Sequence, residues 1–381
     1  MSCDRYEIDI VKTNLKTALN ALGGIRALIP SGSGVFLKVN LLTGRDPKDA
    51  VTTHPVVVQA LASILIENGC RVTIGDSPGG PFLPDRMYRI YRVTGMADAA
   101  MASGAVLNEN LTSVTASFPE GCRLQSFEVM QAVDESEYVI SLCKMKTHSM
   151  TLMTGAVKNM FGIMPGLSKA ALHYRFQKLA DFAHAMVDIC EYKKPVLSVM
   201  DAIEAMEGAG PSAGTVINAN VLLVSTSPHH LDVAAARWMG INPIEVPLLQ
   251  AASERRLCDM AGEDIEWMGV DPEASAVKPF AIPLIRELDF LKHASAVPVA
   301  GALLKAFSNH YLRPKPVVQE KMCIGCQECR VICQADAIEM IESKPVFDLE
   351  KCIRCFCCQE ICPVKAILIH RSWLLNKLSQ S

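Results

Sequence analysis

Two runs of cysteine near the C-terminal end constrain this chain more than any other feature. Nine of its fifteen cysteines lie between residues 323 and 362. Eight of them form two copies of the spacing C-x2-C-x2-C-x3-C: Cys323, Cys326, Cys329, Cys333 and Cys352, Cys355, Cys358, Cys362. The two-residue gaps let three thiolates converge on one metal cluster, while the fourth faces away from that loop. The spacing predicts two [4Fe-4S] clusters.

This arrangement resembles that of a two-cluster bacterial ferredoxin, in which the fourth cysteine of each run crosses to the other cluster. The resemblance implies two ligand sets: Cys323, Cys326, Cys329 and Cys362 for one cluster, and Cys352, Cys355, Cys358 and Cys333 for the other. The two halves repeat at an offset of 29 residues. Crossed ligation would tie the halves together, so we expect a small α+β module whose folding depends on its metal.

Zinc and disulfides are the alternatives to iron–sulfur clusters. Paired zinc knuckles would leave the fourth cysteine of each run without a role. The first run is followed by Gln334 where proline is usual, which removes no ligand. Cys357 fits no ligand position, so we interpret it as a spare thiol close to a cluster, with ligation by Cys357 in place of Cys358 as the alternative.

Composition and charge bound the remaining possibilities. The chain has 381 residues, half of them apolar, and a formal net charge of −3, with scattered lysines and arginines that do not indicate a nucleic-acid binder. The most apolar stretch, 294–307, contains Pro298 and Lys305 and is too short for a membrane span. The charged N-terminal residues and the dispersed remaining cysteines favour a cytoplasmic protein.

The rest of the chain predicts an α/β domain with a mostly parallel sheet and flanking helices. Short β-branched runs alternate with helical segments from residue 35 onward, with strands expected near 35–42, 70–76, 137–142, 195–200 and 220–225. We expect a helix after Thr53, which is a suitable N-cap before Pro55. The predicted division is an α/β ligand-binding domain at 1–270, a helical, proline-broken connector at 271–321 and the cluster module at 322–381.

Charged side chains follow several of the predicted strands. In open α/β sheets, the loops at the carboxyl ends of the strands form the ligand-binding cleft. We assign catalysis to one group and ligand or cofactor binding to another: Lys146, His148, Lys158 and Asn159 for the first, and Lys38, His54, Asp76, Asp201, Glu204 and Glu207 for the second. Any one of these residues alone is more simply a solvated lysine or a buried histidine.

The chemistry of this set is that of an anionic or carbonyl-bearing ligand. Lysines and Asn159 would neutralise carboxylate or phosphate oxygens, and His148 would donate a proton. Alternatively, the three carboxylates of Asp201, Glu204 and Glu207 would bind a divalent cation. The chain contains neither a G-x-x-x-x-G-K-[ST] loop nor a strand-linked G-x-G-x-x-G, which argues against a P-loop enzyme and a standard dinucleotide site.

Six segments of this region resemble domain-of-unknown-function family 362, whose members are often fused to a two-cluster ferredoxin module. The segments begin at Lys38, Thr53, Ile74, Ser141, Thr154 and Met206, and the resemblance covers roughly residues 35 to 255 in order. Cys143 departs from the family, which has proline at that position. A thiol beside two lysines could have a depressed pKa, and the alternative is an ordinary buried cysteine. The resemblance implies the fold and the clusters and supplies no reaction.

Three functions fit the sequence. The first is an iron–sulfur oxidoreductase that passes electrons between the clusters and a small-molecule substrate or electron-accepting cofactor in the α/β cleft. The second is a ferredoxin-like electron carrier or redox adaptor, in which the large domain docks a redox partner protein. The third is a non-redox enzyme that acts on a metal-bound or phosphate ligand and has structural clusters.

Overall fold

The structure is a computed structural model that describes residues 1–270, 278–283 and 313–370. The chain divides into two compact units, Met1–Ile282 and Pro283–Ser381, which are considered separately below. Most of the expected connector at 271–321, including the apolar stretch at 294–307, lies outside the described residues. Within the described residues, no helix is long and apolar enough to cross a membrane.

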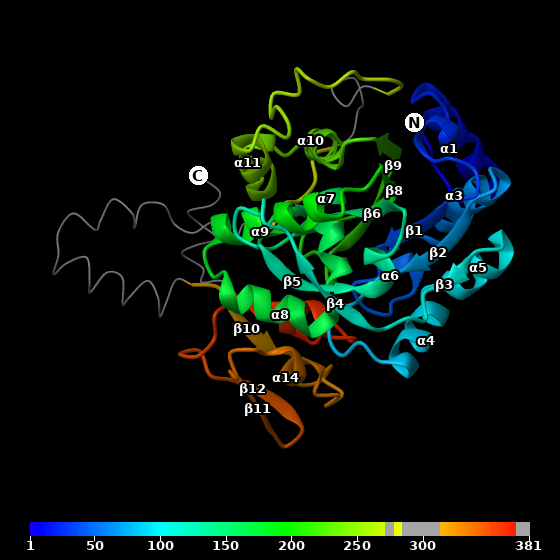
Figure 1. Ribbon diagram of the computed structural model, residues 1–381. Helices are drawn as coiled ribbons and strands as arrows, with labels where there is room; N and C mark the ends of the chain where they lie inside the picture. Colours follow the sequence, from blue (N-terminus) through cyan, green and yellow to red (C-terminus); the bar gives the residue numbers. More distant parts are fainter. Residues whose placement is uncertain (271–277, 284–312, 371–381) are drawn as a thin grey trace. The chain divides into compact units, whose positions relative to one another are not determined.

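The first unit is built on one seven-stranded, mostly parallel sheet (Figure 1). Its strand order is β3-β2-β1-β6-β8-β9, and β7 pairs with β6. The strands are β1 (Gly34–Val39), β2 (Arg71–Gly75), β3 (Val106–Leu107), β6 (Tyr138–His148), β7 (Leu152–Thr154), β8 (Leu197–Glu207) and β9 (Thr215–Ser225). The first three, β6 and β8 run parallel, whereas β7 and β9 are antiparallel to their neighbours.

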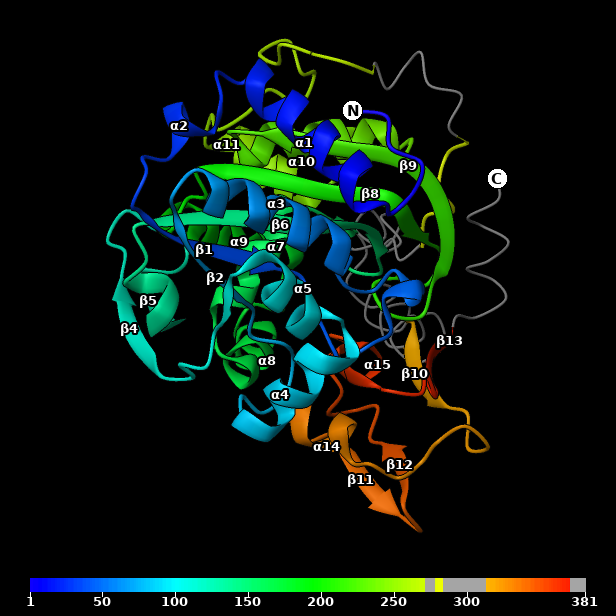
Figure 2. The same cartoon turned by 90° about the vertical axis from the view of Figure 1, so that its right-hand side faces the viewer.

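Helices cover both faces of this sheet (Figure 2). They are α1 (Ile8–Ala21), α2 (Ile25–Leu28), α3 (Pro55–Glu67), α4 (Pro84–Val93), α5 (Met96–Ser103), α6 (Gln131–Asp134), α7 (Ala156–Asn159), α8 (Gly166–Arg175), α9 (Leu179–Tyr192), α10 (Pro228–Trp238) and α11 (Pro247–Glu254). Short 3-10 turns lie at η1 (Pro47–Asp49), η2 (Met160–Ile163) and η3 (Pro243–Glu245). A separate hairpin joins β4 (Ser113–Ser117) and β5 (Ser126–Met130).

Alternation along the strands produces two hydrophobic cores. In β1, Val35 and Leu37 belong to the core that contains α1, α3 and α5, whereas Phe36 belongs to the core that contains α9, α10 and α11. Successive side chains of a strand point to opposite faces, and a parallel sheet is buried on both. This is the α/β architecture with flanking helices expected from the sequence.

Two local features differ from the expectation. The N-cap of α3 is His54, whose Nδ1 accepts a hydrogen bond from Val56 N at 3.3 Å, while the Thr53 hydroxyl donates to Leu142 O. Strand β8 continues to Glu207, where the sequence indicated a turn after residue 200. Polar residues are tolerated there because β9 pairs with the strand along its whole length, with one irregularity between Ala202 and Glu204.

The second unit repeats one strand–helix–strand motif. The first copy is β10 (Lys315–Val318), α14 (Glu328–Ile332) and β11 (Ile338–Ile341), and the second is β12 (Lys344–Phe347), α15 (Cys357–Ile361) and β13 (Ile367–His370). Pairing is crossed, since β10 pairs with β13 and β11 with β12. Strand β10 therefore forms part of this unit, although its residues fall in the range that the sequence assigned to the connector.

Candidate functional site

A buried lysine–aspartate pair lies at the carboxyl ends of β1 and β2. Lys38 Nζ is 2.8 Å from Asp76 Oδ1, and the two side chains are 1% and 4% exposed. The other oxygen of Asp76 accepts a hydrogen bond from Leu41 N at 2.7 Å. Burial lowers the pKa of Lys38, and the charge of Asp76 opposes that shift. The two predicted residues are thus brought together, as an ion pair in the protein interior.

Two asparagines connect this pair to Lys146 on β6. Asn159 Oδ1 accepts hydrogen bonds from Lys38 Nζ at 3.1 Å and from Asn40 Nδ2 at 3.3 Å. Asn40 Oδ1 in turn accepts one from Lys146 Nζ at 2.7 Å, and Val51 O accepts a second at 2.6 Å. The amide of Asn159 donates to Lys38 O and to Ser141 Oγ. Three segments that are far apart in sequence thus meet in one hydrogen-bonded network.

Gly162 is required for the close packing of this network. A Cβ atom at this position would lie 2.2 Å from Asp76 Oδ1 and 2.5 Å from both Cε and Nζ of Lys38. The backbone of η2 therefore approaches the ion pair as closely as a residue without a side chain allows. Ser77 N also donates to Gly162 O at 3.1 Å, which holds the loop after β2 against this turn.

A second buried pair joins Lys144 on β6 to Asp201 on β8. Lys144 Nζ lies 2.8 Å from Asp201 Oδ2, and neither side chain is more than 1% exposed. Tyr6 completes the group: its hydroxyl donates to Asp201 Oδ1 at 2.9 Å and accepts from Lys144 Nζ at 2.8 Å. Burial, with Asp201 nearby, raises the pKa of the Tyr6 hydroxyl. Tyr6 was not expected from the sequence.

His54 lies against the second pair. Its ring stacks on that of Tyr6 with centroids 3.5 Å apart, and its backbone N–H donates to Asp201 Oδ2 at 2.9 Å. Burial lowers the pKa of His54 to about 4, opposed by Asp201 and assisted by Lys144. His54 is therefore neutral at physiological pH, which matches its use of Nδ1 as an acceptor in the cap of α3.

His148 closes β6 on the way into β7. Its Nδ1 lies 3.0 Å from Met150 N and 3.3 Å from Thr151 N, so it accepts hydrogen bonds from the tight turn that follows. Since Nδ1 acts as an acceptor, the ring hydrogen lies on Nε2. His148 is 1% exposed. The other predicted residue, Lys158, is half-buried in α7 with its ammonium 6.0 Å from the centre of the Phe161 ring.

Glu204 and Glu207 are placed apart from Asp201. Glu204 contributes a backbone N–H that donates to the Tyr6 hydroxyl at 3.1 Å, and Glu207 Oε2 accepts from Ala281 N at 2.7 Å. Within the described residues, the one group of three or more potential metal ligands within 4.8 Å of one another consists of Cys190, Glu191 and His229. The structure therefore does not bring the three carboxylates together as the cation site that the sequence suggested.

Two further charged residues at this edge were not predicted. Lys169 on α8 donates from Nζ to Ser77 O, in the loop that follows Asp76. Asp232 on α10 accepts hydrogen bonds from Ala156 N at 2.6 Å and Val157 N at 3.1 Å, and so caps α7, which carries Lys158 and Asn159. Burial raises the pKa of Asp232 to about 7, against the effect of these two bonds. In the sequence, the charge of Lys169 and its place in the short helix α8 are the features that could have pointed to this residue, and both are weak signals.

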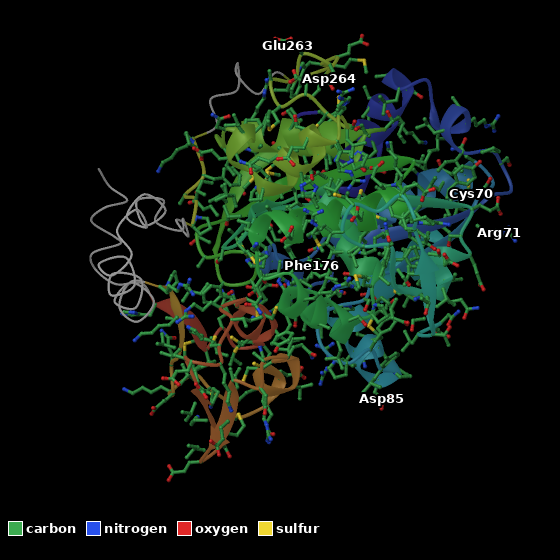
Figure 3. The ribbon with its side chains drawn as sticks, turned by 60° about the vertical axis from the view of Figure 1, so that its left-hand side comes forward. Cys70, Arg71, Asp85, Phe176, Glu263 and Asp264 are labelled. Atoms are coloured by element: carbon green, nitrogen blue, oxygen red, sulfur yellow. The ribbon has the colours of Figure 1, made fainter. Side chains whose placement is uncertain are left out.

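The site faces away from the amino ends of the strands. Cys70 and Arg71, at the start of β2, lie at the right-hand margin of the α/β unit in Figure 3, whereas Phe176, just beyond α8, lies towards its centre. The side chains described above come from the opposite ends of β1, β2, β6 and β8. This is the carboxyl edge, where ligands bind in open α/β sheets.

In the second unit, thiols of the two cysteine runs lie close to one another, as the two crossed sets expected from the sequence require. Burial raises the pKa of Cys329 to about 11, with further contributions from the nearby Cys326, Cys362 and Cys323. Burial also raises the pKa of Cys358, and the nearby thiols are those of Cys355, Cys352, Cys329 and Cys333, so that one cysteine of the other set is also close. In both halves the fourth cysteine accepts a backbone hydrogen bond, from Ala337 N to Cys333 Sγ at 3.4 Å and from Ala366 N to Cys362 Sγ at 3.2 Å.

These sets fit iron–sulfur clusters by their chemistry. Each offers four sulfur atoms, and N–H groups directed at a ligand sulfur stabilise the negative charge of a cluster. Cys357 lies beside Cys355, with which it shares a side-chain hydrogen bond. Cys143 is 1% exposed and its thiol donates to Val199 O at 3.5 Å; burial raises its pKa, so the depressed pKa considered from the sequence is wrong.

Comparison with known proteins identifies the family. The model described as "Domain of unknown function (DUF362)" matches residues 35–237, and the model described as "4Fe-4S dicluster domain" matches residues 315–363. The chain belongs to the DUF362 family and carries a C-terminal iron–sulfur domain, which confirms the resemblance seen in the sequence.

Two individual proteins are also similar. The chain is 29% identical over 310 residues to a thylakoid-associated protein of Synechocystis, covering 81% of this chain and 92% of that protein. A search of solved structures finds the lactate racemase apoprotein from Thermoanaerobacterium thermosaccharolyticum, with a TM-score of 0.38 and 13% identity. That match covers 61% of this chain and spans 56% of the other.

Proposed function

We propose that this member of the DUF362 family is an oxidoreductase that exchanges electrons between two [4Fe-4S] clusters and an anionic, carbonyl-bearing ligand. The observation that carries the proposal is the concentration of lysines at one edge of the sheet. Lys38 on β1 and Lys144 and Lys146 on the neighbouring strand β6 are each at most 1% exposed. Burying three ammonium groups costs free energy, so a fold that retains them indicates a use for their charge.

The proposed roles follow from the contacts. Asp201 and Tyr6 both bind the ammonium of Lys144, so we assign this lysine a structural role in the site. Lys146 donates to Asn40 Oδ1 and Val51 O, and we assign it the role of supplying positive charge to ligand oxygens. Its neighbour on β6, His148, carries its ring hydrogen on Nε2, which suits it to donate a hydrogen bond to a ligand oxygen that gains negative charge as electrons arrive. Lys158, on the adjoining turn of α7, adds a second cation.

The clusters, when bound, supply one-electron transfer. The eight cysteines hold them, with Cys333 and Cys362 as the crossed ligands. Fusion on one chain keeps the electron carrier and the ligand site at a high effective concentration.

The test is anaerobic reoxidation of the reduced protein. Protein with reconstituted clusters would be reduced with dithionite, freed of excess reductant and mixed with 2-oxo acids, aldehydes and phosphorylated carbonyl compounds, and cluster absorbance would be followed. We expect at least one compound to reoxidise the clusters, and Lys146→Met to slow this about a hundredfold. Lys48→Met, at an exposed lysine, is the control and should not change the rate. If no compound of these classes accepts electrons, the proposal fails.

A second candidate function is electron transfer to a protein partner. It is favoured by large apolar side chains exposed on the cluster unit: Met322, Ile324 and Val331 are 45%, 65% and 49% exposed. Such side chains are common in the cores of protein interfaces. Because one relative is named as thylakoid-associated, a redox protein at a membrane is one class of partner. Ile324→Glu would then weaken partner reduction, whereas Lys146→Met would have no effect.

A further inference from the structure

Three potential metal ligands lie together outside the candidate site. Cys190 and Glu191 are in the last turn of α9, and His229 is at the start of α10. Helix α9 leads into β8, and α10 follows β9, whose last residue, Ser225, pairs with Ser198 near the start of β8. The three residues therefore lie at the amino end of β8, whereas the candidate site lies at the carboxyl edge of the sheet.

The three ligand atoms are close enough to share one ion. One sulfur, one carboxylate oxygen and one ring nitrogen all lie within 4.8 Å of one another, and His229 Nε2 is 2.8 Å from Glu191 Oε1. Zinc bonds of about 2.0–2.3 Å in a tetrahedral site place the ligand atoms about 3–4 Å apart. Small changes in the side-chain torsions of Cys190 and Glu191 would therefore bring the three atoms around an ion between them.

Burial distinguishes this group from a cluster of exposed polar residues. The side chains of Cys190 and His229 are 0% exposed, and that of Glu191 is 14% exposed. The Nδ1 atom of His229 is buried and, among the described residues, has no hydrogen-bond partner. Because no donor opposes a hydrogen on Nδ1, the ring can carry its hydrogen there and direct the lone pair of Nε2 at a metal. In that tautomer, Nε2 and the Glu191 oxygen face each other with lone pairs, an arrangement that a cation between them stabilises.

The charges of the group match those of a divalent ion. Bound as thiolate and carboxylate, Cys190 and Glu191 carry two negative charges, so a zinc complex with neutral His229 has no net charge. Such a complex avoids the desolvation cost of an isolated buried ion. Lys194 Nζ is 3.6 Å from Glu191 Oε2, and its side chain is 50% exposed, so it can turn into solvent when the ion binds. Thiolate and imidazole ligands favour zinc over magnesium and calcium.

We propose that Cys190, Glu191 and His229 bind one Zn²⁺ ion, which joins the end of α9 to the start of α10. On binding, the Cys190 thiol releases its proton to solvent, Nδ1 of His229 carries the ring hydrogen, and a solvent molecule fills the fourth position. No electrons are exchanged. Both helices belong to one hydrophobic core, so the ion braces one face of the α/β unit. This inference does not depend on the proposed function, which uses other residues.

Zinc binding would be tested on full-length protein with reconstituted clusters, because the eight cluster cysteines would otherwise bind zinc themselves. The protein would be mixed anaerobically with a slight excess of zinc chloride and desalted. Its zinc content would be measured by elemental mass spectrometry and its zinc ligands by X-ray absorption spectroscopy. We expect about one zinc ion per chain, with one sulfur ligand at about 2.3 Å and nitrogen and oxygen ligands at about 2.0–2.2 Å.

Substitutions identify the ligands. Cys190→Ser should remove the sulfur signal, and both Cys190→Ser and Glu191→Gln should weaken zinc binding at least about tenfold in competition with a fluorescent chelator. Because the Glu191 side chain reaches the surface, Glu191→Gln should fold even where a change at the buried Cys190 does not. Cys258→Ser, at another buried cysteine of the α/β unit, is the control and should change neither the zinc content nor the sulfur signal.

Three results would overturn the inference. Desalted protein without zinc would show that the group holds no ion. Zinc with four sulfur ligands would place the ion at vacated cluster cysteines, and an unchanged zinc affinity of Glu191→Gln would place it elsewhere on the chain. None of these results bears on electron transfer by the clusters, which the reoxidation experiment tests separately.

Discussion

The two units of this chain build their polar centres in opposite ways. In the α/β unit, the charged groups of the candidate site are held by the protein alone, as in the pair of Lys144 and Asp201. In the cluster unit, the described core consists of a few residues, six of them buried and three of those six cysteines. Apolar burial is the main source of folding free energy, so we expect the second unit to need its metal in order to fold and the first unit to fold without one.

The two centres should therefore respond differently to the loss of one of their parts. Removing one partner of a buried ion pair strongly destabilises the folded protein, because the remaining charge is left in the interior with neither a counter-ion nor water. A metal centre instead fails when its ligands are removed or its metal is withdrawn. Chelation, substitution and acidification therefore separate the responses of the two units.

Removal of iron should unfold the cluster unit and leave the α/β unit intact. Without metal, crossed ligation no longer joins the two halves, and four short strands with a small core are insufficient. Hydrogen exchange after chelation should show loss of protection at 315–318, 338–341, 344–347 and 367–370, with little change in β1 and β6. Equal loss of protection in both units would contradict the comparison.

Asp201→Ala should destabilise the α/β unit by about 3–5 kcal/mol, because it leaves Lys144 charged and buried without its carboxylate. Urea unfolding followed by pulse proteolysis of this unit measures the change. The exposed pair of Lys12 and Glu67 provides the matched control: Glu67→Ala should cost less than about 1 kcal/mol. The double variant Lys144→Met, Asp201→Leu should be less destabilised than Asp201→Ala, whereas an additive or larger loss would exclude this explanation.

Gly162→Ala should cost about 1–3 kcal/mol, because the new methyl group would separate Lys38 from Asp76. The same urea measurement applies. Gly34→Ala is the control, since its Cβ would meet nothing closer than Glu137 Oε1 at 3.5 Å and its backbone needs no left-handed conformation. It should change stability by less than about 0.5 kcal/mol. Equal effects at both glycines would show that close packing on the ion pair is unimportant.

Acidification should weaken the α/β unit through His54. Its pKa is about 4 in the folded protein and about 6.5 in the unfolded chain, so the unfolded state binds more protons between these values. The stability that the neutral ring contributes is present above pH 6.5 and is lost as the pH falls towards 4. We expect His54→Asn, which keeps a capping side chain, to reduce this loss by on the order of 1 kcal/mol. If His54→Asn leaves the pH dependence of the unfolding free energy unchanged, His54 is not the cause of the loss.

Much of the candidate site could be predicted from the sequence, because the carboxyl ends of parallel strands lie together at one edge of a sheet. Lys38, Asp76 and Lys146 follow separate apolar runs, and parallel pairing of β1, β2 and β6 brings their ends to one edge. The cysteine spacing was more informative still, since ligand geometry around a cluster leaves few alternatives. The iron–sulfur content and the family were predicted on this basis, while the roles of individual site residues stay predictions.

Other features depend on contacts that no local pattern encodes. Tyr6 reaches Asp201 across 195 positions of sequence, and nothing in its surroundings distinguishes it from an ordinary surface tyrosine. The carboxylates of β8 suggested a turn because a lone strand would not bury Asp201; its ion pair with Lys144 on the neighbouring strand permits burial. The position of Lys169 in the site could not be predicted, because it depends on the packing of the loop after β2 against α8.

The hydroxyl of Tyr6 has a consequence for the timing of motions in the site. Its hydrogen is donated to Asp201, and its oxygen accepts from Lys144 and from Glu204 N, which occupies all three bonding positions of the group. No position remains for a water molecule, so this hydrogen can exchange with solvent only when the cluster of bonds opens. The exchange lifetime of this hydroxyl hydrogen, measured by NMR on the protein without added ligand, therefore reports how often the buried ion pair opens.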